Sequence, residues 1–286
     1  MKIVVEAGAT KSDWRILDCG SGQQPQDGSC ERRLVLPGMN VSTIAMEHNL
    51  QVLSDGLRQA GCSALDGFYL YTAGIVTPEV REHLSQFVRD SVQVDDVDVQ
   101  DDLVAAARSV CGRSEGVVAI LGTGSNACWW DGRAVSFRVR SGGYVIGDEG
   151  GGAALGKMFL GDLIKGLVPK ELESAFAQTH DASYEGIVAL VYRSESAAGA
   201  LGSLAPWLLE RYDSSKYVKE LIDGNFRSFI KRSLLRYEEA SHHPVGVVGG
   251  WGSACREIFT RLCAEEGIRL GRFESQPISG LVRFHA

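Results

Sequence analysis

The sequence lacks the features that mark several classes of protein. Its seven cysteines form no C-x-x-C pair and have no metal-ligand spacing, which argues against a structural zinc or disulfide framework and favours reduced thiols. No run approaches the roughly 18 apolar residues of a membrane-spanning helix. The apolar stretch at the N-terminus is short and is interrupted by Glu6, so no signal peptide is expected. We therefore expect a cytoplasmic protein.

Clustered positive charge is also absent. Lys and Arg total 29 against 36 Asp and Glu, the formal net charge is -7, and the basic residues are scattered. A nucleic-acid-binding or anionic-membrane surface is therefore not expected. A phosphorylated ligand is still allowed, because loop amides and Mg²⁺ can bind one without a basic surface. The P-loop pattern G-x-x-x-x-G-K-[ST] is missing too, so a P-loop is not how phosphate would be held.

The composition is that of an ordinary globular protein, 44% hydrophobic and 23% charged over 286 residues. Apolar strand patterns alternate with helical ones. Strands are predicted at 3–5, 67–75 and 97–99, and helices at 43–60, from 78 and at 103–110. Residues 20–32 are predicted as an exposed polar loop. The stretch from about 153 to 240 is predicted to be mainly helical, followed by a strand at PVGVVGG and a helix from about Ser253.

One pattern occurs twice. KIVVEAGATKSDWRILD (2–18) and GVVAILGTGSNACWWDG (116–132) each combine an apolar strand, a turn of small residues and a second strand with an aromatic residue. Aligning Gly8 with Gly122 makes the second half a distant echo of the first, which predicts two related α/β domains. We place them at 1–114 and 115–286, with the last helix free to pack back on the first domain.

The glycine turns are candidates for binding phosphate. Alone, ILGTGSN (120–126) is typical of a hairpin. A glycine turn also exposes successive backbone N–H groups, which form an anion-binding concavity. Two such turns in matching positions would clamp a polyphosphate. A third cluster, GGWGS (249–253), lies where a nucleoside would fit.

Carboxylates accompany these turns, and each has a simpler explanation. Glu6 ends the first strand, where it would otherwise be a solvated charge. Asp101 or Asp102 would cap the helix that follows, and both interpretations hold if Asp101 caps and Asp102 faces a cleft. Asp148 and Glu149 lie in GGYVIGDEGGG, which is either a plain acidic loop or, given its glycines, a binding loop.

Five stretches, in order along the chain, resemble the BadF/BadG/BcrA/BcrD ATPase family, particularly its N-acetylglucosamine kinase-like members, within the sugar kinase, Hsp70 and actin superfamily. They are GATKSDW (8–14), DDLVAAARSVCG (101–112), GVVAILGTGSNACWWDG (116–132), IGDEGGGAALG (146–156) and QPISGLVRFH (276–285). GTGSN together with GDEG is the specific part of the match, and GGWG is a weak part. The resemblance implies an α/β fold with two actin-like (ribonuclease H-like) domains flanking an ATP cleft.

The resemblance also implies roles for individual residues. Asp102 matches the catalytic aspartate, and Glu6 matches the position that holds Mg²⁺ through water, where relatives usually carry Asp. The ATP-binding positions are Gly8, Ala9, Thr10 and Lys11, then Gly122, Thr123, Gly124 and Ser125, and finally Gly249 and Gly250. The amino-sugar positions are Asn40, Asn126, Gly143, Tyr144 and Asp148.

The implied activity is transfer of phosphate from ATP, with Mg²⁺, to a small amino sugar, in the first place to the 6-hydroxyl of N-acetylglucosamine. The alternatives are a kinase for N-acetylmuramic acid or another amino sugar, an ATPase that activates a radical dehydratase, and a nucleotide-binding sensor without turnover. The activator would need cysteines for an Fe–S cluster. Two further departures from the family pattern are Ser196–Gly199 and Trp251. No nucleic-acid or membrane partner is expected, and a homodimer is left open.

Overall fold

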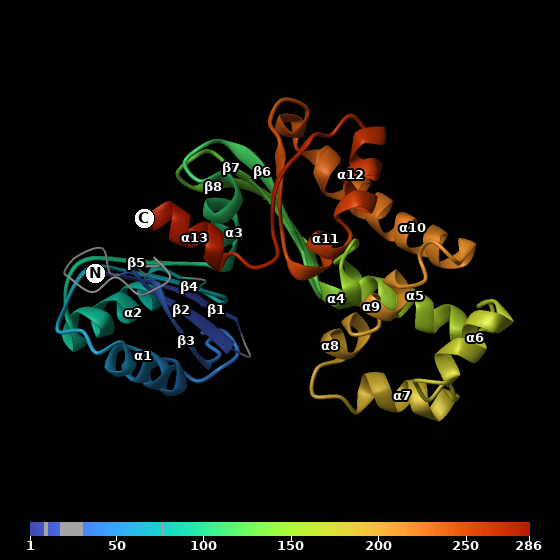
Figure 1. Ribbon diagram of the computed structural model, residues 1–286, viewed down its shortest axis with the longest axis horizontal. Coiled ribbons are helices and arrows are strands. Elements are labelled where there is room, and N and C mark those ends of the chain that lie inside the picture. Colours follow the sequence, from blue (N-terminus) through green and yellow to red (C-terminus); the bar gives the residue numbers. More distant parts are fainter. Residues whose placement is uncertain (9–10, 18–30, 76) are drawn as a thin grey trace. The chain divides into compact units, whose positions relative to one another are not determined.

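The computed structural model describes residues 1–8, 11–17, 31–75 and 77–286, which form two compact units (Figure 1). Unit 1 comprises Met1–Gly112 and Pro277–Ala286, and unit 2 comprises Arg113–Gln276. The chain passes from unit 1 to unit 2 between Gly112 and Arg113 and returns to unit 1 at Pro277.

Unit 1 is built on a five-stranded sheet with the order β3-β2-β1-β4-β5. β1 pairs antiparallel with β2, β2 pairs antiparallel with β3, and β4 and β5 run parallel to β1. The strands are β1 (Lys2–Ala7), β2 (Lys11–Leu17), β3 (Glu31–Pro37), β4 (Ala64–Thr72) and β5 (Gln93–Gln100). The helices are α1 (Met46–Ala60), α2 (Pro78–Ser91), α3 (Asp102–Cys111) and α13 (Ile278–His285).

The two faces of this sheet are covered by different helices (Figure 1). Ile3 and Val5 of β1 pack in a core with residues of α1 and α2. Val4 points to the opposite face, where the buried residues of α3 and α13 gather. Side chains alternate along a strand, so Glu6 lies on the same face as Val4. The sheet therefore presents Glu6 on the side that α3 and α13 cover.

Unit 2 repeats this sheet. Its strand order is β10-β9-β6-β7-β8, with β6–β7 and β7–β8 antiparallel and β9 and β10 parallel to β6. Each sheet thus has the same succession of two hairpin strands on one side of its first strand and two parallel strands on the other. The internal repeat predicted from the sequence is confirmed. The strands are β6 (Gly116–Leu121), β7 (Ser125–Trp130), β8 (Val135–Val139), β9 (Val245–Val248) and β10 (Leu270–Glu274).

Most of the helical sequence belongs to unit 2. The helices are α4 (Gly143–Ile146), α5 (Gly152–Ile164), α6 (Lys170–Ala177), α7 (Tyr184–Tyr192), α8 (Ala197–Gly202), α9 (Ala205–Leu209), α10 (Lys216–Arg232), α11 (Gly250–Ala254) and α12 (Arg256–Glu265), with 3-10 turns η1 (Leu234–Arg236) and η2 (Glu238–Ser241). The predicted helical stretch and the strand after it are confirmed. The predicted helix near Ser253 begins earlier, at Gly250.

Some expected elements differ in their bounds. The first long helix starts at Met46 rather than at residue 43, and the strand predicted at 67–75 runs from Ala64 to Thr72. Residues 31 and 32, expected in a loop, begin β3. In the part of the chain that the structure describes, no helix has both the length and the apolar character to cross a membrane.

Candidate functional site

Glu6 lies at the carboxyl end of β1 and is half-buried. Asp13 of β2 is its direct partner across the antiparallel pair. Burial and then the Asp13 carboxylate raise the pKa of Glu6, Lys11 opposes this shift, and Asp102 adds to it. Glu6 is therefore not a solvated strand-end charge. It belongs to a group of three carboxylates in unit 1.

Asp13 was not anticipated from the sequence. Its side chain is buried and is paired with Arg15 and Arg33. Burial opposes ionisation of Asp13, but the hydrogen bonds and charges of the two arginines outweigh burial and lower its pKa. Asp13 thus keeps its charge beside Glu6. The alternation of β2 shows where Asp13 points, but the sequence does not show that two arginines reach it.

Asp101 and Asp102 differ in their contacts. The Asp101 carboxylate accepts a hydrogen bond from the Val104 backbone N–H at 2.9 Å and caps α3. Asp102 is the first residue of α3, its side chain is exposed, and its charge acts on the pKa of Glu6. The capping interpretation is therefore confirmed for Asp101. Asp102 does not supply that hydrogen bond.

The first glycine turn is only partly described, because Ala9 and Thr10 lie outside the described residues. The Gly8 backbone N–H donates to the Lys11 carbonyl at 3.0 Å, which closes the turn between β1 and β2. Asn40 also lies in unit 1, where its side-chain oxygen accepts a hydrogen bond from the Ser42 backbone N–H at 3.0 Å.

The second glycine turn joins β6 to β7 in unit 2. The Gly122 N–H donates to the Gly124 carbonyl at 3.0 Å, and the carbonyls of Gly122 and Thr123 accept from the backbone N–H groups of Gly152 and Ala153 at 2.9 and 2.8 Å. The turn is thus fixed against the start of α5. A Cβ added to Gly122 would meet no heavy atom of the described residues within 4 Å, so the turn has open space on that side.

Asp148 packs directly on this turn. A Cβ added to Gly124 would lie 2.5 Å from Asp148 Oδ2, so only glycine leaves room for the carboxylate. Burial raises the pKa of Asp148, although hydrogen bonds from the Ser141 side chain and from the Ser125 and Gly143 backbones oppose the shift. A residue expected to bind sugar and a turn expected to bind phosphate therefore form one cluster. At 9% exposure, Asp148 is not part of a plain acidic surface loop.

The third glycine segment meets the same turn. Gly249 has φ 122° and packs so closely that an added Cβ would lie 2.2 Å from the Leu121 carbonyl oxygen. Next to Gly250 an added Cβ would again meet no described atom within 4 Å. A cavity of about 690 Å³ begins at Ser253 and extends along α9, α10 and α12. Its size is that of a small-molecule pocket.

The remaining sugar candidates of unit 2 lie beside this cluster. Gly143 and Tyr144 begin the short α4, where Tyr144 is 39% exposed and its carbonyl accepts from Lys157 Nζ at 3.0 Å. Asn126 lies on β7, and its side-chain oxygen accepts from the Ala127 N–H at 3.0 Å. Ser196 caps α8, whose Gly202 packs close to Thr123, so the departure at Ser196–Gly199 keeps a regular helix start.

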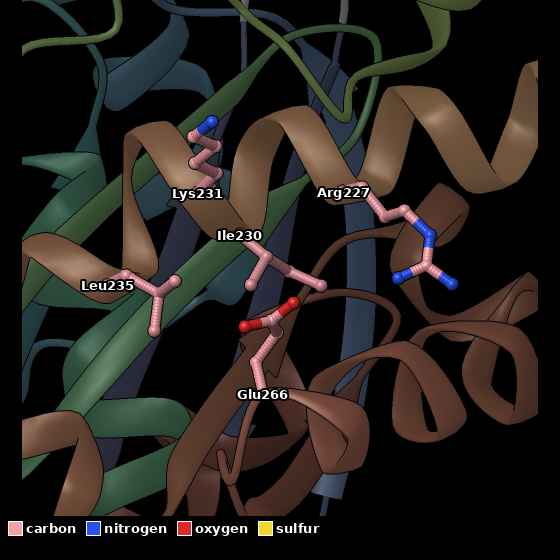
Figure 2. Close-up of a pocket in the computed structure, with 5 residues that line it drawn as sticks. All are labelled: Arg227, Ile230, Lys231, Leu235 and Glu266. Atoms are coloured by element: carbon pink, nitrogen blue, oxygen red, sulfur yellow. The ribbon is translucent and has the colours of Figure 1, made fainter.

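Two further features of the described residues bear on the site. No group of three or more His, Cys, Asp or Glu has a metal-binding arrangement. A second cavity, of about 390 Å³, lies between α10 and the end of α12 and contains none of the candidate residues (Figure 2). It is lined by Arg227, Ile230, Lys231, Leu235 and Glu266.

Comparison with known proteins was made by sequence and by structure. No protein-family model and no curated protein matches the chain. A solved structure from Porphyromonas gingivalis, provisionally named an N-acetylglucosamine kinase, is 31% identical, with a TM-score of 0.84 over 100% of this chain and 98% of that one. A protein of the same provisional name from Chromobacterium violaceum is 18% identical, with a TM-score of 0.72 over 100% and 98% of the two chains.

A ROK family glucokinase from Streptomyces griseus, solved with glucose and AMPPNP, shares the fold more distantly. It is 16% identical, with a TM-score of 0.52 over 99% of this chain and 97% of that one. The two five-stranded mixed sheets and these neighbours confirm the predicted class, a mixed α/β fold of the actin-like type.

Proposed function

We propose a function from one premise: the chain belongs to the N-acetylglucosamine kinase-like members of the BadF/BadG/BcrA/BcrD ATPase family, in the sugar kinase, Hsp70 and actin superfamily. The protein is a sugar kinase that transfers the γ-phosphoryl group of ATP to an amino sugar. Its acceptor is the 6-hydroxyl of N-acetylglucosamine. The observation that carries this proposal is the cluster in unit 2, where the turn after β6, Asp148 and Gly249 are packed together.

The nucleotide would be bound against the backbone of the glycine segments. Gly122 and Gly250 have open space where a side chain would stand, so a ligand atom can approach their backbone. The cavity at Ser253 has room for a nucleoside. Gly8 and Lys11 supply the matching turn of unit 1, with Ala9 and Thr10 between them in the sequence.

Mg²⁺ fits the carboxylates of unit 1 by the chemistry of the donor set. The pKa of Glu6 is raised by burial and by two neighbouring carboxylates, which is an environment that a cation relieves. Mg²⁺ keeps several waters and is usually held by one or two carboxylates, so a larger ligand cluster is not required. Glu6 would hold the ion, which supplies charge neutralisation on the phosphates.

Asp102 would accept the proton of the attacking sugar hydroxyl, since it is exposed at the start of α3 and its charge acts on the nearby Glu6. Asp148 would orient the sugar by accepting hydrogen bonds from its hydroxyls. Asn40, Asn126, Gly143 and Tyr144 are the further sugar contacts of this proposal. Phosphoryl transfer needs mainly positioning and electrostatic stabilisation, which these groups provide.

The test is a panel of sugars assayed with ATP and Mg²⁺ by coupled detection of ADP, with the phosphorylated position identified by NMR. Turnover of N-acetylglucosamine at its 6-hydroxyl, well above that of the other sugars, supports the proposal. Preference for N-acetylmuramic acid or another amino sugar would correct the substrate and keep the chemistry. Binding of AMPPNP without turnover of any sugar would overturn the kinase in favour of a nucleotide sensor.

A further inference from the structure

The backbone of the loop Gly147–Gly151 has an unusual conformation. Asp148, with φ 56°, is the only described residue other than glycine that has positive φ. Gly150 has φ 83°, and a Cβ there would lie 2.7 Å from Phe229 Cβ. Such conformations cost free energy and persist only where the surroundings fix them. The contacts that fix this loop therefore decide where the Asp148 carboxylate points.

Asn225 of α10 makes two of these contacts. Its side-chain oxygen accepts from the Gly150 N–H at 2.9 Å, and its side-chain nitrogen donates to the Gly151 carbonyl at 3.1 Å. Asn225 is 2% exposed and lies on the buried stripe of α10 with Ile222 and Phe226. A polar side chain on an apolar stripe is unfavourable unless it is hydrogen-bonded. Here the oxygen and the nitrogen of the Asn225 side-chain amide are both hydrogen-bonded to the loop backbone.

Trp251 makes a third contact from a different element. Its indole N–H donates to the Gly150 carbonyl at 2.9 Å. The ring is buried and stacks on Phe226, with centroids 5.7 Å apart and planes at 14°. Trp251 therefore points into the core of unit 2. The backbone N–H of Gly150 is thus held by α10, and the backbone carbonyl of Gly150 is held by α11.

We propose that Asn225 and Trp251 are positioning residues, which fix the loop Gly147–Gly151 so that the Asp148 carboxylate is directed at the sugar. The proposal rests on the proposed function for its substrate. A tryptophan inside the segment that would bind adenosine thus acts on sugar binding. The residue at which the sequence departs from the family pattern, Trp251, therefore serves to fix the loop Gly147–Gly151. It leaves the open space beside Gly250 unobstructed.

The chain offers a matched pair of variants. Trp251→Phe keeps an aromatic ring against Phe226 and removes the N–H that holds Gly150. Trp207→Phe makes the same chemical change in the same core, where the indole N–H is buried and has no hydrogen-bond partner among the described residues. Asn225→Asp is the second test, because it keeps the acceptor for Gly150 and removes the donor to Gly151.

Two readouts are measured on each full-length variant, with thermal melts to compare folding. The first is amide hydrogen exchange of the peptide that covers 147–153. The second is KM for N-acetylglucosamine and for ATP, together with kcat. Trp251→Phe and Asn225→Asp should exchange faster in this peptide and raise the sugar KM about tenfold, the effect of losing one hydrogen bond. Trp207→Phe should stay within about twofold of the native protein in both.

The outcomes separate the two proposals. Equal behaviour of Trp251→Phe and Trp207→Phe would overturn the positioning role, as would faster loop exchange with an unchanged sugar KM. Suppose that exchange is faster only in Trp251→Phe and Asn225→Asp, and that the native protein phosphorylates no sugar. This result would support the positioning of the loop by the two residues and would overturn the kinase proposal.

Discussion

Asp101 and Asp102 are adjacent carboxylates with different contacts, and this makes them a natural pair for mutation. Asp102→Asn removes the group that we propose as the base, so kcat should fall by about 10²- to 10⁴-fold while the melting temperature is unchanged. Asp101→Ala removes the cap of α3 and should cost about 1 kcal/mol of stability with kcat near native. Steady-state assays and thermal melts of both variants test this. Native kcat in Asp102→Asn would refute the base assignment.

Replacing Glu6 by glutamine should have opposite effects on stability and on activity. The pKa of Glu6 is raised in the folded protein, so the folded state favours the protonated form. The stabilising contribution is complete below the ordinary glutamate pKa of about 4.3 and is lost as the pH rises through the raised value. Glu6→Gln should therefore melt at a higher temperature than the native protein near pH 7, and the difference should vanish near pH 4.

The same variant should lose Mg²⁺-dependent turnover. Glu6→Asp keeps a carboxylate and should retain turnover, since a contact through water tolerates a change of one methylene. Titrations with Mg²⁺ and melting curves from pH 4 to 8 provide the measurements. If Glu6→Gln and Glu6→Ala are as active as the native protein, Glu6 has no role in holding the metal.

Single residues show where reading the sequence succeeded and where it stopped. The separation of Asp101 from Asp102 was predictable, because a cap and a neighbour that faces away follow from helix geometry. The contact of Asp148 with Gly124 was not, because it joins two loops through a close packing that no local pattern encodes. Asn225 could have been singled out from the sequence, because it is a polar residue on an otherwise apolar helical stripe.

At the scale of elements, the turn between β6 and β7 gives a sharp test of ligand binding. Gly122 has open space where a Cβ would stand and no positive φ, so Gly122→Ala should fold like the native protein. The added methyl group should keep a phosphate away from the backbone of the turn and weaken AMPPNP binding at least about tenfold. Calorimetry measures the affinity.

Gly161→Ala is the matched control, because Gly161 of α5 also has open space and lies within a helix. It should bind AMPPNP like the native protein and gain about 0.5–1 kcal/mol of stability. Unchanged affinity in Gly122→Ala would mean that the turn is only a hairpin connection.

The repeat of strand, glycine turn and strand predicted the first hairpin of each sheet, because alternation and turn residues are local. β3, β8 and β10 escaped prediction for a related reason. All three have partly exposed residues without strict alternation, and each is held as an outer strand by a single neighbour. Pairing with that neighbour, rather than the pattern of the strand itself, defines them.

At the scale of the whole molecule, the last helix contributes to the unit that the chain begins with. Leu281 of α13 is 0% exposed, and Gly280 packs so closely on α3 that a Cβ would lie 2.4 Å from the Ser109 carbonyl oxygen. Leu281→Ala should cost about 2–5 kcal/mol and destabilise unit 1 selectively.

Denaturant titration with separate probes for the two units measures this, and Ser279→Ala, at an exposed position of the same helix, is the control. Unit 1 should unfold at lower denaturant in Leu281→Ala, and turnover should disappear with it. Simultaneous loss of both units would contradict a selective effect.

The discontinuity of unit 1 also sets an order of events during biosynthesis. Unit 2 is one continuous segment, Arg113–Gln276, and domains generally fold as units while the chain emerges from the ribosome. Most of unit 1 is synthesised first, yet the helix that closes one face of its sheet is synthesised only after the whole of unit 2. That face of the sheet therefore gains its final cover only after unit 2 has been synthesised, so a nascent chain holds a complete unit 2 before it holds a complete unit 1.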